Sequence, residues 1–362
     1  MTKLFRGLIL SCLVLSACGG SGGEQKPAPA PGPPPKVAEP FSFDAMKEIA
    51  REANYTAREF KPFIGEEWLG HAISYGPFRD GQEPGQKGPT EGEILSDLQL
   101  IGKNWKHIRL YDSSEVSELV LKVIRKNHLP IRVMLGVWIA PPDKFDWAAK
   151  GNKTQVENAV RLAKEYSDIV IGINVGNETQ VSWSFHRTDR NLLLKAIRAV
   201  RNNVTQPVTT ADDYNFWNKE ESRSMAEEVD FIVVHLYAMW NGQKLAEAIP
   251  WMEKNYSGIQ ALHPGKMLVI GEAGWATTYN ASKKGPGDQG TLIKGEVNEK
   301  AQKAFYEALS GWIDERKVTT FWFEAFDENW KGGGTASGPL EVEKHWGLYT
   351  ADRKPKLAAQ SL

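Results

Sequence analysis

Short apolar runs alternate with longer amphipathic segments along most of the chain, and this alternation limits the possible folds more than any other feature. Several runs are almost continuously hydrophobic, as expected of parallel strands that are covered on both faces. The expected strands are 68–75, 107–112, 131–139, 169–176, 208–214, 231–237, 267–275 and 319–326. Eight repeats of strand and helix predict an α/β protein with the (β/α)8 TIM-barrel fold, in preference to a doubly wound sheet.

The segment before the barrel predicts export and lipidation. Lys3 and Arg6 precede an apolar run at 8–14 that is too short to span a bilayer, so residues 1–17 are expected to be a signal peptide. The run ends in Leu-Ser-Ala-Cys, which resembles the bacterial lipobox and makes Cys18 the expected lipidation site. Residues 18–40, rich in proline and glycine, predict an extended tether, and 41–362 predict one barrel domain.

An ordinary secretory signal cut after Ala17 is the alternative, and the cysteines favour lipidation. Cys12 leaves with the signal, so the mature chain carries Cys18 at its first position with no second cysteine to pair with. Gly19 and Gly20 stand where an inner-membrane retention signal has aspartate. The resemblance to lipoproteins therefore predicts a place in the cell envelope, at the outer membrane, on its periplasmic face or the cell surface.

Charge and the remaining motifs exclude other classes of protein. The formal net charge is -1 and becomes -3 without Lys3 and Arg6, and no basic block occurs, so a nucleic-acid partner is not expected. Neither a phosphate-binding glycine loop nor a histidine or cysteine cluster with metal spacing is present, so neither cofactor nor metal is expected. We expect a monomer.

Polar and aromatic residues close the expected strands, where a TIM barrel carries its chemistry. A single such residue usually meets solvent or caps a helix. Two glutamates are different because the fold fixes their separation. With strands ~4.8 Å apart and tilted ~36°, Glu178 after the fourth strand and Glu272 in the seventh bring their carboxyls to about 6 Å. That value is close to the ~5 to 5.5 Å of retaining glycosidases.

A retaining mechanism gives each carboxyl a role. We assign Glu272 as the nucleophile and Glu178 as the acid/base. Asn177 is expected to bind the sugar 2-hydroxyl and Tyr237 to orient the nucleophile. About half of the 13 tryptophans are expected in the core. Those at strand ends or in the following loops could stack on sugars: Trp138, Trp183, Trp217, Trp240, Trp275, Trp330 and Trp346.

Six motifs in order resemble those of glycoside hydrolase family 17, the β-1,3-glucanases and glucanosyltransferases of clan A. They are RLYD at 109–112, VGNE at 175–178, VHLY at 234–237, GEAGW at 271–275, FEAFDENWK at 323–331 and HWGLY at 345–349. The resemblance spans residues 65–356. It implies the same roles for Glu178 and Glu272, and substrate contacts from Tyr75, Tyr237, Glu324, Glu328 and Lys331.

The expected activity is that of a retaining endo-β-1,3-glucanase acting on laminarin-like polysaccharide, a glucan endo-1,3-β-D-glucosidase. A β-1,3-glucanosyltransferase would use the same site and covalent intermediate, so the two stay open. A non-catalytic, glycan-binding lipoprotein is a further alternative, which the retained glutamates oppose. The last alternative is a hydrolase that acts on a β-1,4-glucan or a mannan, because a shared fold by itself is only an analogy and does not identify the substrate.

The lipobox generates a direct test. Cys18→Ala removes the acceptor of the lipid, so the variant is expected to appear as soluble protein or to keep its signal, which fractionation of membranes and mass spectrometry measure. Cys12→Ala is the matched control and should remain membrane-bound. Unchanged membrane association of Cys18→Ala would contradict lipidation.

Overall fold

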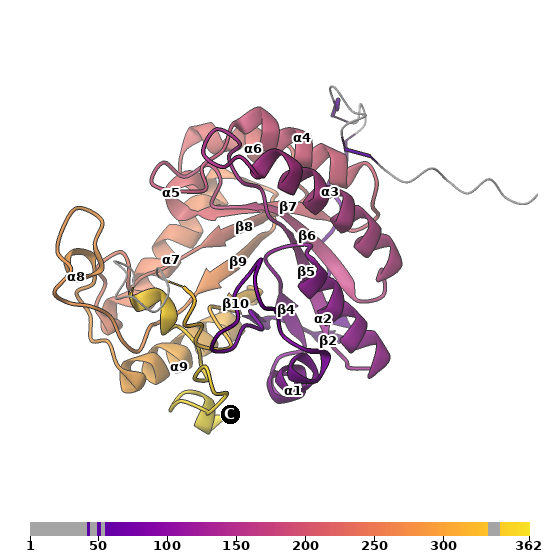
Figure 1. Ribbon diagram of the computed structural model, residues 1–362. Helices are drawn as coiled ribbons and strands as arrows, with labels where there is room; N and C mark the ends of the chain where they lie inside the picture. Colours follow the sequence, from indigo (N-terminus) through magenta and orange to yellow (C-terminus); the bar gives the residue numbers. More distant parts are fainter. Residues whose placement is uncertain (1–41, 44–48, 52–54, 332–340) are drawn as a thin grey trace, which may run out of the picture. The chain divides into compact units, whose positions relative to one another are not determined.

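Eight parallel strands close into a barrel in the computed structural model, which describes residues 42–43, 49–51, 55–331 and 341–362 (Figure 1). Around the barrel the strands follow the order β10-β3-β4-β5-β6-β7-β8-β9. Their bounds are β3 (His71–Ser74), β4 (His107–Arg109), β5 (Arg132–Val137), β6 (Val170–Asn177), β7 (Val208–Asp213), β8 (Ile232–His235), β9 (Leu268–Ala273) and β10 (Thr320–Trp322). The predicted (β/α)8 fold is confirmed.

The helices lie outside the ring of strands (Figure 1). The longer ones follow β3, β4, β5, β6, β8 and β9: α1 (Glu91–Ile101), α2 (Glu115–Lys126), α3 (Ala148–Glu165), α4 (Arg190–Arg201), α7 (Leu245–Leu262) and α9 (Glu299–Arg316). Short helical turns complete the connections: α5 (Tyr214–Trp217), α6 (Arg223–Ala226), α8 (Gln289–Leu292) and the 3-10 turns Glu220–Ser222, Glu341–Lys344 and Ala359–Ser361.

Local sequence signals set several element ends. Thr90 and Glu93 form a reciprocal capping box at the start of α1, in which each side chain accepts from the other residue's backbone N–H. The start of the barrel differs from the prediction. Trp68 belongs to a small antiparallel hairpin of β1 (Phe63–Ile64) and β2 (Glu67–Trp68), and the first barrel strand begins only at His71. Apolar content alone did not separate the two strands.

A small apolar cluster that includes Phe60, Phe231 and Phe321 is distinct from the main core. Phe60 precedes the hairpin, is buried, and stacks on Phe231 with ring centroids 4.4 Å apart. Gly172 of β6 lies directly under the Phe60 ring, and a Cβ there would come within 2.9 Å of it. Glycine at this position therefore permits the close approach of ring and strand.

The described residues, 42–362 with their gaps, belong to one compact unit. The expected signal peptide (1–17) and tether (18–40), with Cys18, lie outside the described residues, so these parts of the domain prediction stay predictions. Within the described ranges, every helix is too short or too polar to traverse a lipid bilayer.

Replacing the Phe60 ring should destabilise the barrel. Phe60→Ala removes a buried aromatic side chain, and we expect the free energy of unfolding to fall by about 3 to 5 kcal/mol, measured by urea denaturation. Phe63→Ala, at a position that is 44% exposed, is the matched control and should change it by less than about 0.5 kcal/mol. Equal effects of the two substitutions would contradict the packing role of Phe60.

Candidate active site

The carboxyl ends of the strands bring the candidate residues together at one end of the barrel, here called the mouth. His235, the last residue of β8, is paired in register with Glu272 of β9. Asn177 ends β6 and is paired with Ala211 of β7, and Glu178 follows it directly. Parallel register therefore places the two predicted catalytic glutamates around the same space.

Glu272 is held by hydrogen bonds that stabilise its charged form. Its Oε1 accepts from Arg109 Nη1 at 2.8 Å and from the Tyr111 hydroxyl at 3.0 Å, and its Oε2 accepts from the Tyr237 hydroxyl at 2.7 Å. Burial alone would raise the pKa of Glu272, but His235, Arg109 and the two tyrosines outweigh it, and the net shift is below the usual 4.5. Glu272 is therefore ionised at neutral pH.

Glu178 lies in the opposite electrostatic situation. Burial raises the pKa of Glu178 well above its usual 4.5, and the charges of Glu272 and Asp213 raise it further, while Arg109 lowers it. The backbone turns sharply here, because Gly176 and Glu178 both have left-handed φ angles, of 81° and 52°. This conformation is costly for a non-glycine residue and is typical of functional positions. Glu178 is therefore suited to carry a proton.

His235 lies between the two glutamates. Its Nδ1 is 3.0 Å from Glu178 Oε1, and its Nε2 is 3.4 Å from Glu272 Oε1. One oxygen of each glutamate and one nitrogen of His235 all lie within 4.8 Å of one another. The two carboxyl oxygens are thus closer than the predicted separation of about 6 Å, and they lie near the ~5 to 5.5 Å of retaining glycosidases. Burial lowers the pKa of His235 to about 4, so its imidazole is neutral at neutral pH.

Arg109 is the most connected of the residues at this site that the sequence prediction missed. It is fully buried, and besides Glu272 its Nη1 donates to the Gly271 carbonyl at 2.9 Å, while Nη2 donates to Asn177 Oδ1 at 2.6 Å. Its position at the end of β4, in the RLYD motif, was the available signal. Tyr111 and His235 were not among the predicted site residues either, although they lie in the RLYD and VHLY motifs.

Asp212 of β7 fixes the loop that follows Glu178. Its carboxylate accepts from the backbone N–H groups of Gln180 at 2.7 Å and Val181 at 3.2 Å. Burial raises the pKa of Asp212 to about 7, although the hydrogen bond from Gln180 opposes the shift. This contact holds the turn that presents the Glu178 side chain.

Glu324, Glu328 and Lys331 form an ion cluster beside these residues. Lys331 Nζ lies 2.6 Å from Glu324 and 2.9 Å from Glu328, and 4.6 Å from the centre of the Phe323 ring. Phe323 in turn contacts Tyr237, with ring centroids 5.8 Å apart. The predicted trio therefore adjoins the mouth.

A further carboxyl, Glu343, is influenced by the charges of the same residues and was not predicted. Burial raises the pKa of Glu343 to about 7, Lys331 lowers it, and Glu178 and Glu272 raise it. Its place in the sequence, two residues before the HWGLY motif, gave no separate signal.

Two predicted substrate contacts lie elsewhere, and their expected placement is corrected. The Tyr75 side chain is buried, and its hydroxyl points away to Asp97 of α1 at 3.3 Å. Trp275 is fully buried, packs on Phe305 and donates to the Glu296 carbonyl at 2.8 Å. Both residues follow a strand end, but their side chains turn toward the helices, where neither ring presents a surface to a sugar.

The remaining tryptophans of the sugar-stacking prediction divide by exposure. Trp217 and Trp346 are fully buried and belong to the core, Trp183 is exposed, and the others are half-buried: Trp138, Trp240 and Trp330. The exposed and half-buried tryptophans therefore remain available to a ligand.

One cluster among the described residues has the composition of a metal site: Glu178, His235 and Glu272. Glu272 already accepts from Arg109 and two tyrosines, and the guanidinium lies 3.3 Å from the second nitrogen of His235. A fixed positive charge at this distance repels a metal cation. The contacts instead suit one ionised and one protonated carboxyl, the pair that glycoside hydrolysis requires.

Solved structures share the barrel. An endo-laminarinase from Formosa Hel1_33_131 is 27% identical with a TM-score of 0.67, over 80% of this chain and 86% of that one. A glycoside hydrolase family 17 β-1,3-glucanosyltransferase from Rhizomucor miehei superposes with a TM-score of 0.61 over 79% of this chain and 95% of that one. At 23% identity, this second likeness concerns the fold alone.

Curated relatives are similar in sequence. A glucan 1,3-beta-glucosidase of Arthroderma benhamiae is 27% identical over 279 residues, which cover 74% of this chain and 84% of that protein. A probable glucan endo-1,3-beta-glucosidase, btgC, of Aspergillus clavatus is 27% identical over 287 residues, and the match spans only 39% of that longer protein.

The family model described as the BtgE/BtgC glycoside hydrolase domain matches residues 72–347, a range that contains both glutamates and every barrel strand but the first residue of β3. This match agrees with the resemblance seen in the motifs. The chain belongs to the BtgE/BtgC glycoside hydrolase domain family.

Proposed function

We propose that this glycoside hydrolase is a retaining endo-β-1,3-glucanase. The observation that carries the proposal is the pairing of a carboxylate of lowered pKa, Glu272, with a carboxyl of raised pKa, Glu178, within 4.8 Å of each other. Such a separation leaves no room for a water molecule to attack from the far side of the sugar, as an inverting enzyme needs. The names of the laminarinase and glucanase relatives support β-1,3-glucan as the substrate.

The reaction then proceeds in two displacements. A Glu272 oxygen attacks the anomeric carbon and the glycosidic C–O bond breaks, while Glu178 gives its proton to the leaving oxygen. The ionised Glu178 next takes a proton from water, whose oxygen attacks the same carbon and releases Glu272. Tyr237 and Arg109 hold Glu272 in position throughout the first step.

The acceptor of the second step decides between hydrolysis and transfer. A sugar hydroxyl in place of water gives a β-1,3-glucanosyltransferase with the same residues, and the Rhizomucor miehei structure bears that name. Product masses from defined β-1,3-oligosaccharides distinguish the two. If all products are shorter than the substrate, the protein is a hydrolase, and if some are longer, it is a transferase. Glu272→Ala serves as the inactive control. If the unmodified protein gives no more product than this control, both activities are refuted.

We propose further that the enzyme is a monomer anchored by a lipid on Cys18 to the cell envelope, at the outer membrane. The lipobox-like sequence and the lone mature cysteine support the lipid anchor.

The opposite pKa shifts predict a bell-shaped pH profile of kcat/KM. Activity should rise as Glu272 loses its proton below pH 4.5, and fall as Glu178 loses its proton well above pH 4.5. Initial rates on laminarin across pH measure both limbs. Glu178→Gln, whose amide does not titrate, should abolish the alkaline limb together with most of the activity, and a preserved limb would assign it to another group.

Removing the acid should affect substrates unequally. Glu178→Ala should lose at least about 100-fold in kcat on polysaccharide, because the leaving oxygen then departs unprotonated. A glycoside with a very acidic phenol as leaving group needs no proton and should keep much of its rate in the first step. Glu324→Ala is the control carboxyl, and it should affect both substrates alike. Full activity of Glu178→Ala on polysaccharide would contradict the assignment of Glu178 as the acid/base.

The contact with His235 should oppose the rise that burial causes in the pKa of Glu178. The Arg109 guanidinium can only donate hydrogen bonds, and its Nη1 lies 3.3 Å from His235 Nε2. A proton on Nε2 would therefore face another N–H group. We place the imidazole proton on Nδ1 for this reason. Nδ1–H then donates to Glu178 and favours its ionised form. His235→Ala should shift the alkaline limb to higher pH, while His235→Asn, which keeps a donor near Nδ1, should restore it. An unmoved limb in His235→Ala contradicts this contact.

A further inference from the structure

The loops after β5 and β6 carry a surface that the two displacements do not use. Large apolar side chains are exposed there: Trp147 is 55% exposed, Trp183 59% and Phe185 66%. Isolated exposed rings are common on protein surfaces, whereas a contiguous group of them marks a binding surface. Two of these rings, Trp147 and Phe185, belong to such a contiguous group.

Five aromatic side chains form a continuous aromatic row, in which each ring contacts the next. Trp138 and His186 have ring centroids 4.7 Å apart, and His186 and Phe185 6.2 Å apart. Phe185 contacts Phe145 at 5.4 Å, and Phe145 contacts Trp147 at 5.4 Å. The row therefore joins two loops that are separate in the sequence into one apolar surface.

The aromatic row begins beside the acid/base. Trp138 follows Val137, the last residue of β5, and Val137 is paired in register with Val175 of β6. The same strand β6 ends in Asn177 and leads into Glu178. From this point the row extends along the loops to Trp147, which directly precedes α3. The row thus starts at the carboxyl end of the strand that neighbours the one leading into Glu178.

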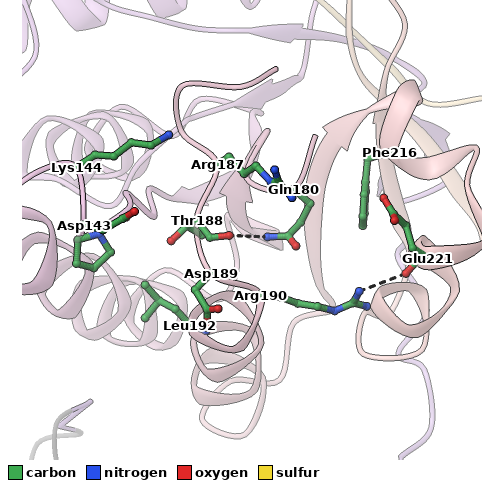
Figure 2. A pocket seen from close by; sticks show the side chains of 11 residues that line it. Asp143, Lys144, Gln180, Arg187, Thr188, Asp189, Arg190, Leu192, Phe216 and Glu221 are labelled. Carbon is green, nitrogen blue, oxygen red and sulfur yellow. Dashed lines mark hydrogen bonds between the residues drawn. The ribbon is translucent and has the colours of Figure 1, made fainter. Parts of the chain in front are cut away.

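A hollow of about 850 Å³ lies between these two loops, the start of α4 and the segment that follows β7 (Figure 2). Lys144 connects it to the aromatic row, because its Nζ donates to the Phe185 carbonyl at 3.2 Å and lies 5.5 Å from the centre of the Phe185 ring. Gln180, just beyond Glu178, lines the hollow and donates to the Thr188 carbonyl. This volume is in the range of ligand-binding clefts.

The charges of the hollow decide the class of ligand. Its lining contains three cationic and three anionic side chains: Lys144, Arg187, Arg190, Asp143, Asp189 and Glu221. Balanced charge gives no net attraction for a phosphate, an acidic peptide or a basic one. Polar groups that both donate and accept, beside flat apolar rings, suit a neutral pyranose, which offers hydroxyls at its edge and C–H groups on its faces.

We propose that the aromatic row and the hollow form a distal subsite for a neutral glucan chain, and this inference rests on the proposed function. Because the surface starts beside Glu178, which protonates the leaving oxygen, its occupant is the leaving part of the chain, beyond the scissile bond. The subsite therefore acts only on substrates long enough to reach it, and it gives the enzyme a preference for internal bonds of long chains.

Two substrates separate this subsite from the catalytic centre. Laminarin reaches the row, whereas an aryl β-laminaribioside has only an aryl group beyond the scissile bond. In the full chain, Phe185→Ala and Trp147→Ala should each raise KM for laminarin about tenfold, a loss of about 1.4 kcal/mol of binding. kcat for laminarin and both constants for the aryl substrate should stay unchanged. Phe63→Ala, an exposed phenylalanine in the β1–β2 hairpin, is the matched control and should alter nothing.

Each other outcome has a definite meaning. Unchanged KM for laminarin in both variants, or equal changes on both substrates, overturns the distal subsite and leaves the proposed function standing. If the unmodified protein cleaves neither substrate, the proposed function fails. Titration of tryptophan fluorescence with a β-1,3-linked hexasaccharide then tests the subsite by itself: Phe185→Ala must weaken binding, and an unchanged affinity overturns the subsite.

Discussion

The buried guanidinium of Arg109 is the interaction on which the rest of the site depends. From the end of β4 it reaches Glu272 on β9, Asn177 on β6 and the neighbourhood of His235 on β8. A buried charge is costly unless it is paired and hydrogen-bonded, and removing one partner of such a pair typically costs about 3 to 5 kcal/mol. The barrel can bury this cation because three other strands deliver acceptors to it, and β9 contributes the Gly271 carbonyl as well as Glu272.

The same cation makes two chemically identical side chains different. Glu272 touches Arg109 and accepts from Tyr111 and Tyr237, so its negative charge is stabilised. The side chain that contacts Glu178 is His235, which is neutral, and the negative charge of Glu272 lies close to Glu178. Environments that push two carboxyls apart in pKa are what divide the nucleophile from the acid. Fold position and local contacts thus both contribute to the proposed chemistry.

The sequence predicted the barrel and the assembly of Glu178, Glu272, Asn177 and Tyr237, because strand ends of a closed parallel barrel must meet at one mouth. It did not predict the direction in which a residue beyond a strand end turns. Trp275 illustrates this: it belongs to the same motif as Glu272, yet the turn after β9 points its ring into the layer between strands and helices. Direction depends on the loop's backbone and packing, which no local pattern encodes.

The sequence by itself determined the alternation of strands and helices, the two glutamates and the lone cysteine of the expected mature chain. Tertiary structure alone decided which partners surround those glutamates, because Arg109, His235 and Glu272 are far apart in the chain and meet only through barrel closure. The aromatic row likewise exists only where the β5 and β6 loops pack together. Periodicity is a local property of a chain, whereas electrostatic environment is a property of the space that distant segments enclose.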